Sequence, residues 1–150
     1  MLKVRIIPIL TFNGFALVKT KQFAQPRMVG NPVQAARVYN SRGVDELIFL
    51  DIFASKQNRK QNLNIVRDVI KECFMPVGIG GGIKTIEDIQ ALLKIGADKV
   101  VIKTQALTNP DFILEASNFF GAQCITISAD IKKQEDRYMV HNELDRKSVV

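Results

Sequence analysis

The chain has 150 residues, 47% of them hydrophobic, 24% charged and 7% aromatic, a composition typical of a globular domain and not of a disordered or collagen-like chain. Twenty-one basic against 15 acidic residues give a formal net charge of +6, but the basic residues are scattered and not interleaved with aromatics, which disfavours nucleic acid and favours phosphorylated small molecules as partners. No apolar run approaches the roughly 20 residues of a membrane helix, and no cleavable signal is visible, so we expect a cytoplasmic protein.

Short β-branched runs alternate along the chain with amphipathic stretches. The predicted strands cover residues 4–9, 46–51, 76–80, 99–103 and 123–130. The predicted helices cover residues 32–42, 62–73, 86–95 and 110–119. Asn31 and Asn109 each precede a proline, the signature of a helix N-cap, and Gly43, Gly96 and Gly121 follow three of the helices, where a left-handed residue ends a helix.

Two of these strands, at residues 47–50 and 100–102, are continuously apolar, as expected of a parallel sheet covered on both faces. A closed (β/α)8 barrel and an open doubly wound sheet both fit this order. In either architecture the ligand binds at the carboxyl ends of the strands. Polar or flexible residues follow those ends, namely Thr11, Asp51, Gly80 to Gly82, Thr104 and Asp130.

The glycine run at residues 78–82 lacks the third glycine of the dinucleotide fingerprint, because Ile83 stands in its place. A nicotinamide cofactor is therefore disfavoured. Cys73 and Cys124 lie far apart, so we expect two buried thiols and no disulfide framework. His141 is the only histidine, and with no second ligand in view we expect a surface histidine and no metal site.

Several runs together carry a family resemblance, in order and at matching spacing: residues 5–8 (RIIP), 17–19 (LVK), 45–47 (DEL), 50–52 (LDI), 54–55 (AS), 80–83 (GGGI), 96–100 (GADKV) and Asp130. The chain resembles the first half of the cyclase subunit of imidazole glycerol phosphate synthase. This resemblance implies a (β/α)8 TIM barrel of about 250 residues. Residues 1–150 would then supply four β/α units, the fifth strand and the start of a hairpin arm, with the remainder of the barrel absent.

The resemblance also implies a heterodimeric glutamine amidotransferase without a cofactor. A glutaminase partner docks at the bottom of the barrel and releases ammonia, which crosses the barrel to a phosphorylated substrate at the top. There the cyclase, a lyase, uses two aspartates as proton carriers. Asp130 matches one of them, and the residues that match substrate or phosphate contacts are Lys19, Asp51, Gly82 and Thr104.

Two positions depart from the family pattern. Thr11 stands where the other catalytic aspartate is expected, and a hydroxyl cannot act as a general acid or base near neutral pH. Lys103 replaces an asparagine beside the phosphate, and a lysine can still bind phosphate as a point charge. The first change puts the chemistry in doubt, whereas ligand binding survives the second.

At the bottom of the barrel, Arg5, Glu46 and Lys99 match three members of the charged ring that gates ammonia entry, and Asp98 matches a residue that faces the glutaminase. The simpler interpretation is that strand starts lie near solvent and carry unremarkable charges. Strict alternation also conflicts with the assignment, because Glu46 and Asp51 are an odd number of residues apart and cannot both point inward without a bulge.

Other roles stay open for these residues. From the sequence alone, Asp130 and Asp51 could each cap a turn, and Gly80 to Gly82 could be only a tight connection. At the level of function, the lost aspartate favours a divergent branch of the family found with surface-polysaccharide genes, where ammonia serves the synthesis of an amidino sugar. The alternatives are a working histidine-pathway cyclase and a non-catalytic module for ammonia channelling and docking.

Overall fold

The computed structural model describes residues 3–21, 24–142 and 147–149. Five parallel strands form the centre of its main sheet: β1 (Ile9–Phe12), β4 (Leu47–Asp51), β5 (Val77–Gly80), β6 (Lys99–Ile102) and β7 (Ile125–Ile127). An antiparallel hairpin of β2 (Leu17–Lys21) and β3 (Ala24–Gly30) continues this sheet, which has the order β3-β2-β1-β4-β5-β6-β7. The predicted run of parallel β/α units is therefore confirmed.

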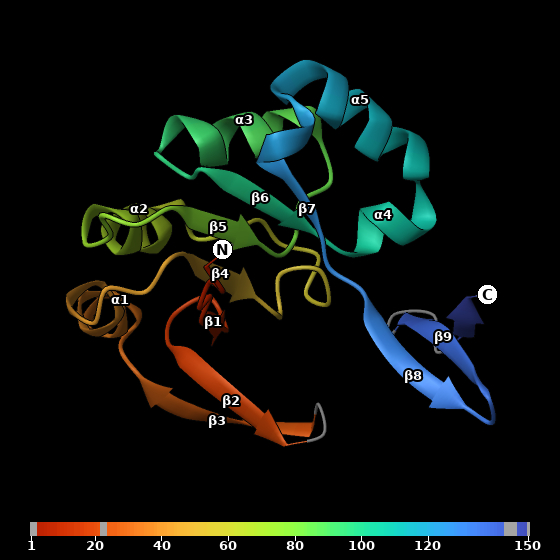
Figure 1. Cartoon of the computed structure of the whole chain (residues 1–150), viewed down its shortest axis with the longest axis horizontal. Helices are drawn as coiled ribbons and strands as arrows, with labels where there is room; N and C mark the ends of the chain where they lie inside the picture. The colour runs from red at the N-terminus through yellow and green to blue at the C-terminus, as the bar shows by residue number, and fades with distance from the viewer. Residues whose placement is uncertain (1–2, 22–23, 143–146, 150) are drawn as a thin grey trace.

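Helices connect the parallel strands and lie on the outer face of the curved sheet (Figure 1). They are α1 (Pro32–Ser41), α2 (Leu63–Lys71), α3 (Ile86–Lys94), α4 (Thr104–Thr108) and α5 (Pro110–Phe120), followed by the short 3-10 helix η1 (Ala122–Cys124). Asn31 caps α1 as predicted, by accepting hydrogen bonds from the backbone of Val33 and Gln34. Asn109 likewise stands at the N-cap position of α5, which begins at Pro110 as predicted, but its side chain makes no cap hydrogen bond.

Side chains alternate between the two faces of the sheet. Leu47 and Phe49 point outward into the core beneath the helices and are essentially inaccessible to solvent. Phe49 packs there against Phe12, with ring centroids 4.8 Å apart. Ile48 and Leu50 point the other way, to the inner face that would line a closed barrel, and are only half-buried.

The first strand begins later than predicted, at Ile9 instead of residue 4. The carbonyl groups of Ile6 and Pro8 already accept hydrogen bonds from the backbone of Asp45 and Ile48. Pro8 has no N–H to return, so the regular ladder starts only at the next residue. The hairpin of β2 and β3 was not predicted, because residues 17–30 lie between the first strand and the first helix without a turn signal.

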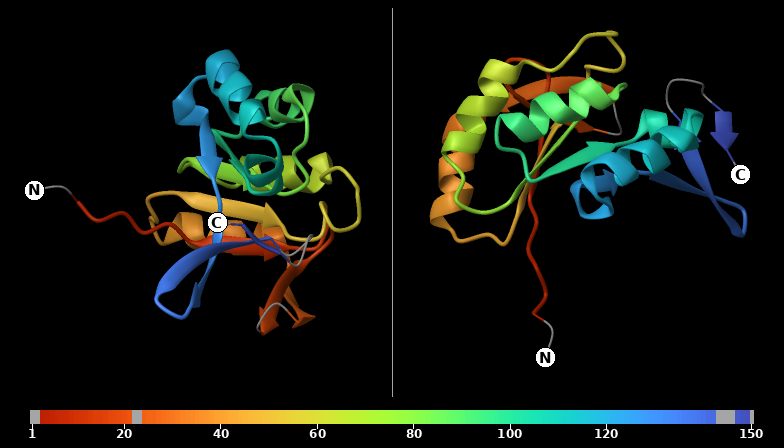
Figure 2. Two further views of the ribbon diagram at one scale, coloured as in Figure 1. Left: turned by 90° about the vertical axis from the view of Figure 1, so that its right-hand side faces the viewer. Right: turned by 90° about the horizontal axis from the view of Figure 1, so that it is seen from above.

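The predicted fifth strand, residues 123–130, divides into β7 and the start of a second sheet. That sheet consists of β8 (Asp130–Gln134), β9 (Arg137–Asn142) and β10 (Lys147–Val149), in the order β10-β9-β8. The hairpin arm predicted around residues 137–141 is therefore confirmed, and Figure 2 shows it projecting from the main sheet. In the described ranges, no helix is long and apolar enough to cross a membrane.

The exposed inner face and edges of this sheet lead us to expect that residues 1–150, without further chain, self-associate. Ile9 lies beside Ile48 on the inner face and is 56% exposed, and an uncovered apolar strand invites association. We expect the 150-residue chain to self-associate in sedimentation velocity, and Ile9→Asp to reduce the association. Leu114→Asp, on the exposed outer surface of α5, is the control that leaves it unchanged. A strictly monomeric, cooperatively folding species would contradict this expectation.

Candidate active site

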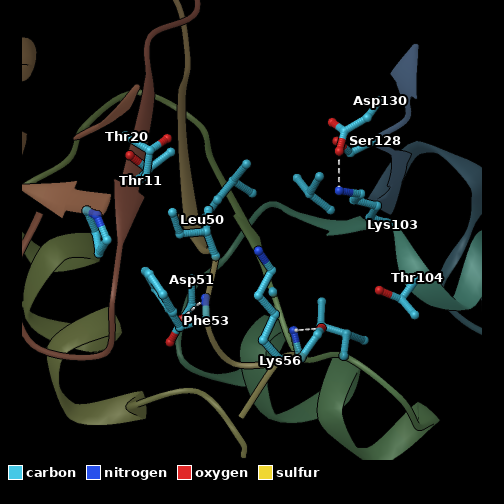
Figure 3. A pocket seen from close by; sticks show the side chains of 17 residues that line it. Thr11, Thr20, Leu50, Asp51, Phe53, Lys56, Lys103, Thr104, Ser128 and Asp130 are labelled. Atoms are coloured by element: carbon cyan, nitrogen blue, oxygen red, sulfur yellow. Dashed lines mark hydrogen bonds and ion pairs between the residues drawn. The ribbon is translucent and has the colours of Figure 1, made fainter. Parts of the chain in front are cut away.

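A pocket of about 300 Å³ opens at the carboxyl ends of the parallel strands (Figure 3). This volume lies at the lower limit for a small-molecule site. The strand ends and the loops that follow them supply its polar lining, which consists of Thr11, Thr20, Asp51, Ser55, Lys56, Lys103, Thr104, Ser128 and Asp130. The main chain of Gly81 and Gly82 closes one side of the pocket.

Lys103 and Asp130 form an ion pair at the mouth of this pocket, between the Nζ atom of the lysine and Oδ2 of the aspartate (Figure 3). Lys103 follows β6, and Asp130 follows β7, the neighbour of β6 in the main sheet, and is the first residue of β8 in the second sheet. About a third of each side chain is exposed, so the pair is open to a ligand. An asparagine at position 103 could not neutralise the carboxylate, and the replacement therefore changes the charge that a ligand meets beside Asp130.

Thr11 lies across the pocket from this pair, in β1 (Figure 3). Its hydroxyl donates a hydrogen bond to the carbonyl oxygen of Val18 in β2. The threonine therefore fastens the β2–β3 hairpin to the barrel strand in addition to facing the pocket. This position holds no group that titrates near neutral pH, and the described residues that line the pocket bring two carboxylates to it, those of Asp51 and Asp130.

Asp51 has both carboxylate oxygens committed to structural contacts and is 4% exposed. Oδ1 accepts hydrogen bonds from the backbone of Phe53 and Ala54, which is the turn-capping role that the sequence left open. The guanidinium of Arg59 donates two hydrogen bonds to the same carboxylate, of 2.6 and 2.9 Å, and a third to the carbonyl oxygen of Asn13. This arrangement fixes the loop after β4 against the loop after β1.

The conflict over Glu46 and Asp51 is resolved without a bulge. The β4 register runs without interruption against β1 and β5. Asp51 shares the outward face with Leu47 and Phe49, whereas Glu46, an odd number of residues away, lies on the inner side. Of the two alternatives that the sequence left open, the structure therefore has no bulge, and the acid that does not point inward is Asp51.

The glycine turn lies beside the pocket and is hydrogen-bonded to the loop after β4. The backbone N–H of Gly82 donates to Ser55 Oγ at 3.2 Å, and Thr104 lies opposite at the start of α4. Lys56 extends from the loop after β4 toward the middle of the pocket (Figure 3). Sequence reasoning did not assign Ser55, Lys56 or Ser128 to the site. Residues 55 and 56 could have been assigned to the site, because they lie in the loop just after a predicted strand end.

Lys19 does not line the pocket. It is exposed on β2, and the neighbouring Thr20 lines the pocket instead. Because alternate residues of a strand point to opposite faces, a side chain at position 19 is directed away from the pocket when position 20 faces it. The structure therefore brings Thr11, Asp51, Gly82, Lys103, Thr104 and Asp130 together, and leaves Lys19 outside.

The opposite end of the strands carries the charged residues that the resemblance assigns to a gate. Glu46 is 4% exposed, and both of its carboxylate oxygens accept hydrogen bonds from Lys99 Nζ, at 2.8 and 2.9 Å. The guanidinium of Arg5 lies 3.6 Å from the same carboxylate. Burying a carboxylate is costly unless it is paired, so the two cations stabilise Glu46 on the inner side of the sheet. Asp98 is exposed and accepts a hydrogen bond from the backbone of Val77 at 2.8 Å.

The part of the chain that the structure describes contains no cluster of three or more metal-ligating residues. The prediction of buried thiols is wrong, since both cysteines are only half-buried. Burial and the nearby charge of Glu72 raise the pKa of Cys73 to about 11, and its thiol donates to the carbonyl oxygen of Val69. A protonated thiol is a poor nucleophile, so Cys73 belongs to the packing of α2.

Residues 5–149 match the family described as "Histidine biosynthesis protein". The chain belongs to this family. It is 49% identical over 142 residues to a Campylobacter jejuni protein with the provisional name imidazole glycerol phosphate synthase subunit hisF2, covering 95% of this chain and 57% of that protein. It is 45% identical over 141 residues to the imidazole glycerol phosphate synthase subunit HisF of an Exiguobacterium species, covering 94% of this chain and 55% of that protein.

The family fold is a (β/α)8 barrel, and the five parallel strands with their outer helices correspond to about half of it. The predicted fold class and the predicted resemblance are both confirmed. The chain spans about half the length of the curated relatives it matches. In a barrel of this family the pocket at the carboxyl ends of the strands lies at the face where barrel enzymes bind their substrates.

Proposed function

We propose that the chain forms part of a HisF-like synthase subunit, in which ammonia from a glutaminase partner crosses the barrel to a phosphorylated substrate. The observation that carries this proposal is the placement of two charged sites at opposite ends of the same strands. Strand β6 begins at Lys99, which pairs with Glu46, and is followed by Lys103, which pairs with Asp130. The inner face of the sheet runs between these sites.

Ammonia transfer makes specific demands on this geometry. Ammonia is neutral and small, so a pathway for it needs an entrance that excludes water and ions. The Glu46–Lys99 pair is suited to this task, because its charges neutralise each other and lie where a barrel interior would begin. At the far end, Lys56 and Lys103 bring positive charge to the pocket and favour an anionic substrate such as a phosphate ester.

Within this family we propose the divergent branch, which feeds ammonia to the synthesis of an amidino sugar of surface polysaccharides. Two changes in the pocket support this choice, namely the loss of the carboxylate at position 11 and the cation at position 103. The name hisF2 of the Campylobacter jejuni relative accords with a second copy. A histidine-pathway cyclase, in which Asp130 carries proton transfer without Thr11, is the second candidate, supported by the HisF relative of Exiguobacterium. A non-catalytic docking module is the third.

The gate assignment predicts the effect of Lys99→Ala in the complete protein with its glutaminase. Removing the ammonium leaves Glu46 with only Arg5 and opens the entrance, so ammonia should leak to solvent. We expect the fraction of glutamine-derived ammonia transferred to the synthase product to fall at least fivefold, while the affinity for inorganic phosphate stays within twofold. Transfer is measured by isotope dilution with external ammonium. Lys94→Ala, at an exposed position of α3, is the control.

An equal loss of phosphate affinity and ammonia transfer in Lys99→Ala would contradict the separation of the two ends. Strand N-termini and C-termini lie on opposite faces of a barrel, so a change at one end has no direct path to a ligand at the other.

A further inference from the structure

The one histidine of the sequence lies beside the pocket carboxylate. In the pairing of β8 with β9, His141 stands directly opposite Asp130. Side chains of directly opposed residues in an antiparallel pair emerge on the same face, with Cβ atoms about 4.5–5.5 Å apart. The structure gives the two side chains no direct hydrogen bond or ion pair, but at this separation a rotation of the side chains can bring an imidazole nitrogen to a carboxylate oxygen. The expected surface histidine is in fact half-buried.

Asp130 is held on one side only. Its Oδ2 atom pairs with Lys103, and within the described residues Oδ1 accepts no hydrogen bond. Asp130 and Lys103 line the pocket, whereas His141 does not. The histidine therefore lies behind the carboxylate and can influence a bound ligand only through it.

Among the described residues, the charged groups around His141 come from three elements. Asp130 and Lys132 share its face on β8, and Arg137 lies on the same face of β9, four residues away. Lys103 approaches from the end of β6 through its pair with Asp130. On β10 the residue opposite His141 is the uncharged Ser148. Asp130 is the only acid in this set, so it is the group with which an imidazolium would interact favourably.

We propose that His141 is a positioning residue that exchanges a proton with Asp130. A proton taken from the substrate by the carboxylate of Asp130 passes to a ring nitrogen of His141 and returns along the same path. One O–H bond breaks as one N–H bond forms, and no redox step is involved. Imidazole suits this role because it gains and loses a proton near neutral pH. The inference rests on the proposed role of Asp130 in proton transfer.

Nuclear magnetic resonance of the full-length protein tests the coupling without a substrate. The ring resonance of His141, identified by its absence in His141→Phe, is followed against pH in the native protein and in Asp130→Asn. Removing a neighbouring negative charge disfavours the imidazolium. We expect the titration midpoint of this resonance to move down by at least half a pH unit, about a threefold change in the proton equilibrium.

Asp136→Asn is the matched control, because it removes the same charge in the turn between β8 and β9, about 15 Å along the ribbon from His141. It should move the midpoint by less than 0.2 pH units. Equal shifts in the two variants would overturn the proposal.

Lys103→Gln provides a second route if Asp130→Asn fails to fold. Removing the competing cation should move the midpoint of the His141 resonance upward, and an unmoved midpoint would overturn the proposal. The result is separable from the proposed function. Normal ammonia transfer together with an uncoupled histidine would refute this inference alone, whereas failed transfer with a coupled histidine would refute the proposed function alone.

Discussion

Gly81→Ala should destabilise the protein by about 3 kcal/mol or more, which is a large part of the 5–15 kcal/mol that stabilises an ordinary domain. The backbone of Gly81 has φ of +105°, a conformation that costs an L-residue on the order of 1–3 kcal/mol. A Cβ atom there would overlap the carbonyl oxygen of Asp51 and lie 2.8 Å from its carbonyl carbon. These are main-chain atoms at the end of β4, and Gly81 directly follows β5. Relieving the overlap would therefore require a shift of one of these two paired strands, which costs free energy.

Denaturant unfolding measures this effect, and Gly43→Ala is its control. Gly43 also has positive φ, at +64°, but a Cβ atom there meets no atom within 4 Å. We expect a cost of about 1 kcal/mol for the control, so the difference between the two variants isolates the clash with Asp51. Similar costs would show that the β4 and β5 ends do not approach each other this closely. The same close approach shapes the pocket, so surviving Gly81→Ala protein should also bind phosphate more weakly.

The parallel sheet could be predicted because its physical signals are local. Residues 47–50 of β4 and 100–102 of β6 are continuously apolar. Gly43 and Gly96 mark helix ends and have positive φ, as the structure confirms. Alternation along one strand showed that Glu46 and Asp51 could both point inward only with a bulge, and the unbroken register of β4 excludes the bulge. Each of these signals lies within a few residues of the feature that it predicts.

The contacts that define the site could not be predicted in this way. Lys103 and Asp130 are 27 residues apart and meet only because β6 and β7 are neighbours whose ends reach the same height. The sequence predicts only a surface histidine at position 141, because the residue opposite it, Asp130, becomes visible only in the register of β8 and β9. The ion pair of Arg59 with Asp51 likewise depends on the conformation of a loop, which the hydrophobic periodicity of the sequence does not predict.

A histidine-auxotroph assay separates the proposed branch from a histidine-pathway cyclase. Loss of a positioned acid or base typically costs about 10² to 10⁴ in rate, and Thr11 supplies neither. The full-length protein, expressed with its glutaminase in a strain that lacks the cyclase, should therefore fail to restore growth without histidine or restore it very slowly. It should still bind inorganic phosphate through the region of Gly82 and Thr104. Robust growth with the unmodified protein would overturn the branch assignment and favour an ordinary cyclase.

The reverse substitutions test whether the rest of the site is intact. Thr11→Asp returns the carboxylate to β1, and Lys103→Asn removes the cation that engages Asp130, so the double variant recreates the charges that the cyclase resemblance implies. We expect its ammonia-dependent cyclase turnover to exceed that of the unmodified protein at least tenfold. Thr20→Asp with Lys103→Asn places the same charge elsewhere on the pocket wall and should give no gain. If neither double variant gains activity, then the pocket has diverged beyond positions 11 and 103, because a correctly placed second carboxylate is by itself sufficient to recover part of a lost acid–base step.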